Sequence, residues 1–347
     1  MGISIGLLPK RERGGGIKSG HTKELFKQIC SIDNLFLAWH KFCRGKRSKM
    51  DVMQYERLLE YHLFELQVAL HNGAYQHGPY VPFTLFDPKR RYIHKATVED
   101  RIVHQAVVNV IEPLFDPRFI FDSYSCRVGK GTHAAVIRLR TFLRRASINN
   151  TRTVYILQCD IKKFFDSVDH RILFDLLKRQ IRDDRVMRLF KKIINSFSTV
   201  PGKGLPLGNL TSQLFANVYL HELDWFVKHM LRETAYVRYC DDFVIVSRTR
   251  EHLQSLITEL NTFLQASLLL ELHPKKVSIR TWKQGVDFLG YVTLPHCTVL
   301  RTKTKQRMIK RVNERNVSSY LGVCAHASAH ETGLLLTCRG YCSSTTA

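Results

Sequence analysis

The sequence predicts an α+β fold in which a small antiparallel sheet packs on helices. Residues 154–158 form an apolar run rich in β-formers and lead directly to Asp160. Two further apolar runs flank residues 239–242 and predict a β-hairpin. Elsewhere apolar residues recur at spacings of three and four, which is typical of helices with one buried face. The resulting order is strand, helix, helix, hairpin, helix, strand.

The N-terminal part of the chain is predicted to be mainly helical. Residues 1–24 contain Gly14 to Gly16 and little periodicity, which indicates a flexible basic arm. From residue 25 to about 73 the pattern is helical, and one apolar face is predicted to hold five leucines, namely Leu58, Leu59, Leu63, Leu66 and Leu70. Residues 85–96 are interrupted by Pro88 and predict a hairpin or an extended segment.

The central part alternates strands and helices. Asp169 stands where an N-cap would begin a helix, and the apolar positions over residues 172–177 continue it. A second helix is predicted over residues 253–264. The last residues, from about 324, hold scattered cysteines and histidines without a CxxC spacing, so we expect a loosely packed tail there rather than a zinc site.

The composition favours a polyanionic ligand. The chain has 347 residues, with 53 Lys and Arg against 30 Asp and Glu, a net charge of +23. Such a charge suits nucleic acid, but by itself it does not distinguish RNA from DNA or a membrane surface. Residues 300–316 hold seven basic residues and one acid, which indicates either a nucleic-acid contact or a solvated basic helix.

Length and residue usage indicate a cytoplasmic protein of two or three subdomains. No apolar stretch approaches the roughly 20 residues that span a bilayer, so no membrane partner is expected. The apolar start is short and is followed, not preceded, by basic residues, unlike a signal peptide. Nine cysteines, an odd number, fit reduced thiols better than a disulfide framework.

Three aspartates carry the chemistry that the sequence predicts. Asp241 and Asp242 are adjacent in the predicted hairpin, and neighbouring carboxylates repel each other unless a cation neutralises them. A turn that simply ends in solvent is the plainer interpretation, since Asp is common in turns. With Asp160 beside the hairpin, the cluster would be able to hold two divalent cations about 4 Å apart, as in-line displacement at phosphorus requires.

Several segments, in order, resemble the conserved blocks of a reverse transcriptase. They are RYIHKATVEDRIVHQA (91–106), SYSCRVGKGTHAAV (123–136), CDIKKFFD (159–166), LPLGNLTSQLFANVY (205–219), YCDD (239–242), LHPKKVSI (272–279) and FLGY (288–291). The resemblance implies a right-hand polymerase with fingers, a palm whose antiparallel sheet packs on helices, and a short helical thumb. It divides the chain into the arm (1–24), fingers with the first part of the palm (25–150), palm (151–298), and short basic thumb with a tail (299–347).

The resemblance also implies a role for individual residues. Asp160, Asp241 and Asp242 would be catalytic and, with Ile161, would hold two Mg²⁺ ions, for which Mn²⁺ is an alternative. The nucleotide-binding residues would be Arg91 for the triphosphate, Phe165 as a steric gate against the ribose 2′-hydroxyl, and Leu207, Gly208, Gln213 and Lys275. Lys89, Arg90 and Lys95 stay open as alternatives to Arg91, and Lys276 as an alternative to Lys275. Template and primer would meet Arg127, Lys130, Phe288, Leu289 and Gly290.

One difference from the usual reverse transcriptase motifs indicates which group of these enzymes the chain resembles. Most reverse transcriptases have Gln-Gly and then Ser-Pro in the nucleotide block, whereas this chain has Leu207-Gly208 and then Ser212-Gln213. That variant resembles the enzymes of diversity-generating retroelements, which make adenine-mutagenised cDNA from a template RNA. These enzymes use deoxynucleoside triphosphates, a primer and a small basic accessory protein that forms a ring.

Other interpretations stay open. A group II intron-type or defence-associated reverse transcriptase would share the chemistry, and a non-catalytic RNA-binding protein would share the palm. After Arg315 the chain departs from the family pattern, and the helices expected of the thumb are abbreviated there.

Overall fold

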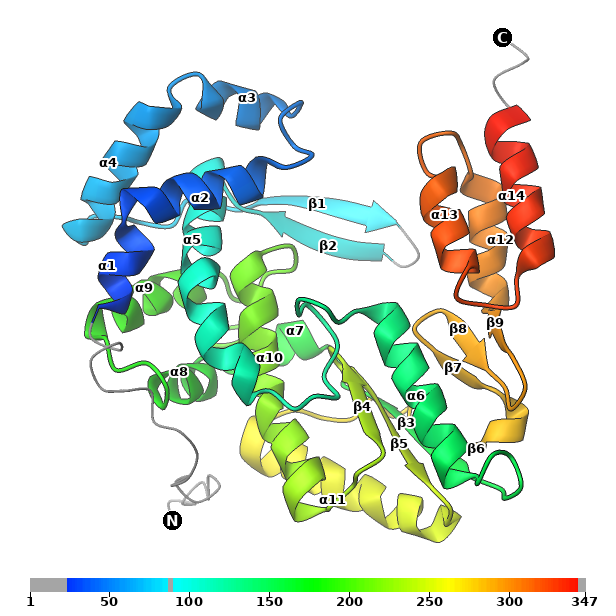
Figure 1. Cartoon of the computed structure of the whole chain (residues 1–347). Coiled ribbons are helices and arrows are strands. Elements are labelled where there is room, and N and C mark those ends of the chain that lie inside the picture. The colour runs from blue at the N-terminus through cyan, green and yellow to red at the C-terminus, as the bar shows by residue number, and fades with distance from the viewer. Residues whose placement is uncertain (1–23, 87–89, 343–347) are drawn as a thin grey trace, which may run out of the picture. The chain divides into compact units, whose positions relative to one another are not determined.

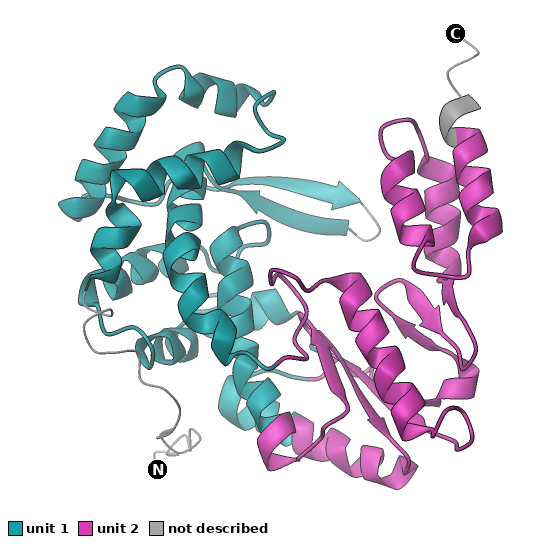
Figure 2. Ribbon diagram, in the orientation of Figure 1, with its two compact units in different colours: residues 1–120, 161–226, 261–271 teal, residues 121–160, 227–260, 272–347 magenta. Residues whose placement is uncertain are grey.

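The chain passes back and forth between two compact units (Figures 1 and 2). The computed structural model describes residues 24–86 and 90–342. Unit 1 comprises residues 1–120, 161–226 and 261–271, and unit 2 comprises residues 121–160, 227–260 and 272–347. The predicted basic arm therefore lies, except for Glu24, outside the described residues.

Unit 1 is helical apart from one hairpin. Its central helix, α5, packs against α2 and α10. The elements of this unit are α1 (Leu25–Cys30), α2 (Ile32–Cys43), α3 (Met50–Glu56), α4 (Leu59–His71), β1 (Val81–Phe86), β2 (Arg90–Lys95), α5 (Val98–Phe115), α7 (Phe164–Ser167), α8 (His170–Lys178), α9 (Asp184–Asn195) and α10 (Leu210–Trp225).

The predicted helices of unit 1 are confirmed, with one correction. The Asp169 side chain accepts hydrogen bonds from the backbone N–H groups of Arg171 and Ile172, so it caps α8 as expected. Leu63, Leu66 and Leu70 are buried, but Leu58 is 60% exposed. Leu58 precedes α4 as its N-cap residue and does not join the buried face. The strands β1 and β2 pair antiparallel, with the turn of the hairpin outside the described residues.

Unit 2 contains both remaining sheets. The larger sheet is antiparallel with the order β4-β5-β3-β6, and the smaller has the order β7-β8-β9. Its elements are α6 (Thr132–Ala146), β3 (Tyr155–Asp160), β4 (Tyr236–Tyr239), β5 (Asp242–Ser247), β6 (Ser278–Thr281), β7 (Val286–Phe288), β8 (Tyr291–Thr293), β9 (Thr298–Leu300), α12 (Thr302–Arg311), α13 (Val317–Cys324) and α14 (His330–Cys342). Helix α11 (Arg250–Leu268) begins in unit 2 and ends in unit 1.

One hydrophobic core holds unit 2 together. Leu139 and Leu143 of α6 pack with Ile156 of β3 and Val244 of β5 in this core, and Figure 1 shows α6 running alongside the strands. The expectation of a loosely packed tail is wrong, because residues 330–342 form α14 and Leu336 is completely buried in the same core. Cys324 of α13 belongs to the same core, and α13 packs against α14.

No helix in the described part of the chain is both long and apolar enough to cross a membrane.

Candidate active site

The strand β3 delivers Asp160 to the centre of the larger sheet. Ile156, Leu157 and Cys159 are buried along it, and the strand has a neighbour on each side, β5 and β6. Asp160 is the last residue of the strand and only 7% exposed. A carboxylate at such a place is costly unless a cation or hydrogen-bond donors accompany it.

The hairpin of β4 and β5 brings the other two carboxylates to the same end of the sheet. Asp160 and Asp242 are directly opposite in the antiparallel register. Tyr239 pairs with Asp242, so Cys240 and Asp241 form a two-residue turn, and Cys240 has a φ of 55°. The right-handed twist of the strands favours left-handed conformations in such turns. The structure therefore brings together the three predicted carboxylates.

The carboxylates of this cluster are buried and repel one another, which raises the pKa of two of them. Burial raises the pKa of Asp241, and repulsion by Asp160 raises it further. Burial also raises the pKa of Asp242 to about 7, with a hydrogen bond to Asp160 as the next cause. Two adjacent carboxyl groups that share a proton behave in this way because both cannot be ionised without cost.

Lys276 supplies a positive charge to the cluster. Its Nζ lies 2.6 Å from Oδ2 of Asp160, and the Asp160 carbonyl accepts a backbone hydrogen bond from His273. The sequence left Lys275 and Lys276 as alternatives for a basic group near the site. Both lysines are exposed, but the structure gives the carboxylate contact to Lys276, whereas the backbone N–H of Lys275 donates to Nδ1 of His273.

The donor set fits a hard divalent cation in its chemistry. Carboxylate oxygens are the ligands that Mg²⁺ and Mn²⁺ prefer, and a cation would relieve the repulsion that raises both pKa values. Within residues 24–86 and 90–342, however, no group of three or more His, Cys, Asp or Glu side chains is arranged to hold a metal ion. Ile161, also predicted to hold metal, follows Asp160 and is buried.

Five of the six predicted nucleotide-binding residues belong to unit 1, whereas Lys275 belongs to unit 2. Arg91 is exposed on β2, and Phe165 is half-buried on α7 with its ring 5.4 Å from that of Phe164. Leu207 is half-buried, and its carbonyl accepts a hydrogen bond from the backbone N–H of His94. Gly208 has a φ of 108° and lies so close to β2 that an added Cβ would be 2.8 Å from Ile93 Cγ2.

The alternatives to Arg91 have local partners. Lys95 lies 2.8 Å from Asp51, and Arg90 lies over the ring of Tyr92. Lys89 is outside the described residues.

A cavity of about 570 Å³ in unit 1 adds residues that the sequence did not single out. Gly208 and Gln213 line it together with four cationic side chains. These cations are Lys46, Lys49, Lys95 and Arg101. Asp51 compensates part of their charge, since it contacts Lys95 and Arg101. The basic residues within 44–49 are visible in the sequence, but nothing in the sequence indicates that they lie close to Gly208.

The predicted template and primer residues lie in unit 2. Lys130 donates to the carbonyl of Phe121 and also lies over its ring, and Arg127 donates to the carbonyl of Ser123. These contacts hold the loop before α6. Leu289 and Gly290 form the two-residue turn between β7 and β8, with φ of 53° and 91°, and the buried Phe288 precedes them.

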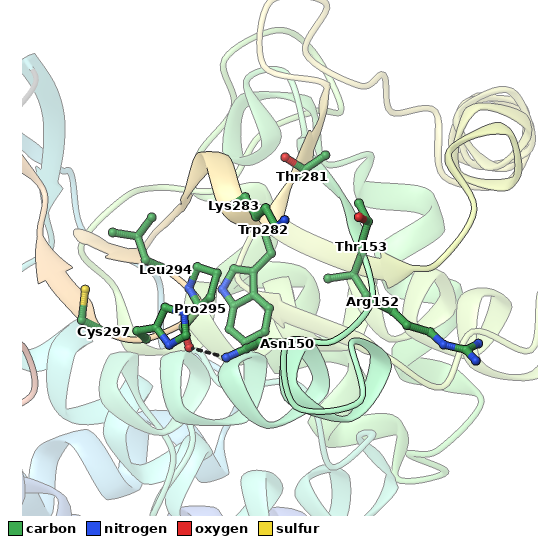
Figure 3. A pocket seen from close by; sticks show the side chains of 11 residues that line it. Asn150, Arg152, Thr153, Thr281, Trp282, Lys283, Leu294, Pro295 and Cys297 are labelled. Carbon is green, nitrogen blue, oxygen red and sulfur yellow. Dashed lines mark hydrogen bonds between the residues drawn. The ribbon is translucent and has the colours of Figure 1, made fainter.

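A second cavity, of about 410 Å³, is lined in part by Val154, which precedes β3 at the opposite end of the strand from Asp160. Figure 3 shows the side chains that line this cavity. Val154 and Trp282 line it, and none of the predicted site residues does. Asn150 donates to the carbonyl of Pro295 across it, whereas Nε1 of Trp282 has no hydrogen-bond partner among the described residues. Six strand residues span roughly 20 Å, so this cavity is remote from the carboxylates.

Comparison with known proteins identifies the family. The family model described as "Reverse transcriptase (RNA-dependent DNA polymerase)" matches residues 87–293, which include all three carboxylates. Protein YkfC of Escherichia coli (strain K12) is 28% identical over 272 residues, which are 65% of this chain and 70% of YkfC. Group II intron-encoded protein LtrA of Lactococcus lactis subsp. cremoris is 26% identical over 271 residues.

The matched region is a different share of each relative's length. The LtrA match takes in 58% of this chain but only 44% of LtrA. A solved structure of apo telomerase from Candida tropicalis, truncated from its C-terminal domain, matches with a TM-score of 0.48 and 12% identity over 65% of this chain and 55% of that one. Because the family model takes in more than half of the chain, this protein belongs to the reverse transcriptases, the RNA-directed DNA polymerases that use a nucleic-acid template, deoxynucleoside triphosphates and divalent metal.

Proposed function

We propose that this reverse transcriptase makes mutagenised cDNA from the template RNA of a diversity-generating retroelement. The observation that supports the polymerase site is the meeting of Asp160, Asp241 and Asp242 at one end of the sheet. Two Mg²⁺ ions bound there would activate the primer 3′-hydroxyl and neutralise the leaving pyrophosphate. Asp160 and Asp241 are the proposed ligands, and Asp242 and the backbone of Ile161 assist.

The proposed subdomains and the proposed roles of the nucleotide-binding residues are as follows. Residues 25–150 form the fingers and first part of the palm, 151–298 the palm, and 299–347 the thumb and its end. Arg91 grips the triphosphate, since a guanidinium can bind phosphate oxygens through two nitrogens. Phe165 excludes the 2′-hydroxyl. Gly208 and Gln213 face the incoming nucleotide, and Lys275 binds its phosphates.

Template and primer are proposed to meet both units. In unit 2 the contacts are Arg127, Lys130 and the turn of Phe288, Leu289 and Gly290. In unit 1 the cationic cavity around Lys46 and Lys49 offers a place for template phosphate, because four cations there face a single described carboxylate, Asp51. The small basic accessory protein is a proposed partner, and the cytoplasm of a bacterial or phage-infected cell is the proposed location.

Loss of one carboxylate tests the polymerase site. Asp241→Asn removes a charge from the proposed metal ligands, so we expect cDNA synthesis on a defined RNA template to fall at least a hundredfold. The assay measures primer extension with Mg²⁺ and deoxynucleotides. Asp175→Asn, an exposed position on α8, is the matched control and should keep wild-type activity. Equal activity of Asp241→Asn and the control would exclude this site.

Leu207 tests the retroelement type. Its apolar side chain replaces an amide that would be able to hydrogen-bond nucleotide or template, and a site that discriminates by shape alone separates similar substrates by only about 1 to 3 kcal/mol. Leu207→Gln should therefore lower the error frequency opposite template adenine about tenfold, as measured by sequencing the cDNA. Synthesis is also measured with and without an accessory protein.

A group II intron-type enzyme is the second candidate, and the similarity to LtrA favours it. It predicts faithful cDNA from the wild-type chain, no dependence on an accessory protein, and no effect of Leu207→Gln on errors at adenine. Accurate wild-type products would thus reject the mutagenic proposal while keeping the polymerase.

A further inference from the structure

Helix α4 is apolar on two opposite faces. One face holds Leu63, Leu66 and Leu70, all at most 2% exposed, and packs against α1 and α2. A surface helix of a globular protein normally has a polar face opposite the buried one. In α4 that outer face instead carries large apolar side chains.

The exposed face forms a continuous stripe. Tyr61, Phe64 and Val68 are 58%, 52% and 57% exposed, and Leu58, just before the helix, is 60% exposed. Spacings of three and four residues place side chains on the same side of a helix, one turn above the other. Single exposed apolar residues are ordinary, but four in a row along one helix are typical of an interaction surface.

The charge beside this stripe is the reverse of the rest of the chain. Residues 56–71 contain three glutamates and one arginine, in a chain with a net charge of +23. Glu56 is paired with Arg47, whereas Glu60 and Glu65 are exposed beside the apolar side chains. Glu65 accepts a hydrogen bond from the Tyr61 hydroxyl, which fixes its carboxylate next to the stripe. Carboxylates repel phosphate, so this surface is unsuited to nucleic acid.

We propose that the α4 stripe, made of Leu58, Tyr61, Phe64 and Val68 with Glu60 and Glu65, docks a separate protein that presents a basic amphipathic helix. Apolar residues of the partner would cover Phe64 and Val68, and its Lys or Arg side chains would pair with the two glutamates. The chain's own positive charge elsewhere repels such a partner, so that binding is confined to this acidic stripe. The surface is independent of the type of reverse transcriptase.

Peptide binding to the full chain tests this surface. The probe is a fluorescent 18-residue amphipathic helix of Leu and Lys, compared with a helix of the same pattern in which Glu replaces Lys. Fluorescence anisotropy should show binding of the Leu/Lys helix that weakens at least tenfold in Phe64→Ser/Val68→Ser. Glu60→Lys/Glu65→Lys should reverse the preference, so that the Leu/Glu helix binds better.

A matched control separates docking from general surface effects. Ile137→Ser removes a comparably exposed apolar side chain, 58% exposed on α6, and should leave peptide binding unchanged. All variants should keep the wild-type urea midpoint because the changed side chains lie on the surface. A reversed preference in the lysine variant is a result that misfolding would not produce.

Three results would overturn the proposal. The first is equal affinity of wild type and Phe64→Ser/Val68→Ser for the Leu/Lys helix. The second is self-association of the wild type that the same variant abolishes in sedimentation, since the stripe would then join two copies of this chain. The third is a loss of RNA affinity in that variant, which would make the stripe a nucleic-acid surface. None of these measurements depends on polymerase activity.

Discussion

At the scale of single residues, position in the sheet and burial determine what each candidate can do. Asp160 and Asp242 face each other across neighbouring strands, and this explains why a hydrogen bond between them contributes to the raised pKa of Asp242. Lys276 contacts Oδ2 of Asp160. The adjacent Lys275 does not make this contact, although both residues are lysines and the sequence could not separate them. The choice between neighbours depended on the direction of each side chain.

Gly208 provides a residue-scale prediction. It combines a φ of 108° with close approach to Ile93, whereas Gly73 has a φ of 71° and open space around it. Gly73→Ala should therefore cost only the left-handed backbone, about 1 kcal/mol of unfolding free energy. Gly208→Ala should cost an additional 1 to 3 kcal/mol or so, because its Cβ overlaps the Ile93 side chain.

Urea unfolding of the two alanine variants checks this difference. Adding Ile93→Ala removes the Cγ2 atom that the new Cβ would meet, so the double change should recover the extra cost after correction for Ile93→Ala alone. Equal unfolding free energies of Gly208→Ala and Gly73→Ala would contradict the close packing of Gly208 against Ile93 of β2.

At the scale of elements, a buried polar network joins the segment before β1 to α5 and α10. His77 and His104 share a hydrogen bond through their Nε2 atoms, and Nδ1 of His104 bonds to Thr211 on α10. The carboxylate of Asp100 accepts from Tyr75 and Thr97. Every one of these groups is in unit 1, and the network fixes α10, whose first turns carry Gln213.

This network predicts a pH dependence of stability. Burial first, and then the charge of His77, lower the pKa of His104 from its usual 6.5 to about 3. Between these values the unfolded chain binds a proton at His104 that the folded chain does not, so His104 makes the protein less stable as the pH falls below 6.5. The raised pKa of Asp242 acts in the opposite direction, so the contribution of His104 is measured by comparison with a variant. The contribution of one such group is at most about 1.4 kcal/mol per pH unit.

Urea unfolding between pH 7 and pH 5 measures this slope. His104→Gln keeps a group able to bond Thr211 but does not titrate, so between pH 7 and pH 5 the wild type should lose more stability, or gain less, than the variant. A slope as steep in the variant as in the wild type would assign the effect to other groups.

At the scale of the whole molecule, the excess of 23 positive charges determines how the enzyme meets its template. Basic residues are distributed over both units, in the unit 1 cavity and along α12, where ten residues include three lysines and two arginines without an acid. Against this background the acidic α4 stripe is a local exception. The residues proposed to contact nucleic acid are thus different from those proposed to dock a basic protein.

RNA binding should accordingly depend steeply on salt. Single-stranded RNA releases counterions when phosphates are neutralised, and about five contacts give a slope of about −3.5 for the logarithm of the association constant against that of salt concentration. Lys46→Ala/Lys49→Ala should make the slope shallower by about 1.4 if both lysines contact phosphate. Lys178→Ala, exposed at the end of α8, is the control. An unchanged slope in the double variant would remove the cavity from the template path.

The sequence by itself predicted several of the helices and strands and named the candidate residues for the chemistry. Apolar periodicity located the helices of residues 25–73, the strand before Asp160 and the cap at Asp169, because these depend on local spacing and local hydrogen bonds. The repulsion of Asp241 and Asp242 was also a local inference. The order of the blocks was enough to indicate the family.

Only the tertiary structure decided what lies next to what. It selected Lys276 for Asp160, joined Lys46 and Lys49 to Gly208 in one cavity, buried Leu336 and exposed Leu58. Each of these outcomes depends on contacts between segments far apart in the chain, and neither propensity nor periodicity contains that information. Helix α4 shows this most clearly. Both of its apolar faces have helical spacing in the sequence, and only the packing of the helix shows which face stays exposed.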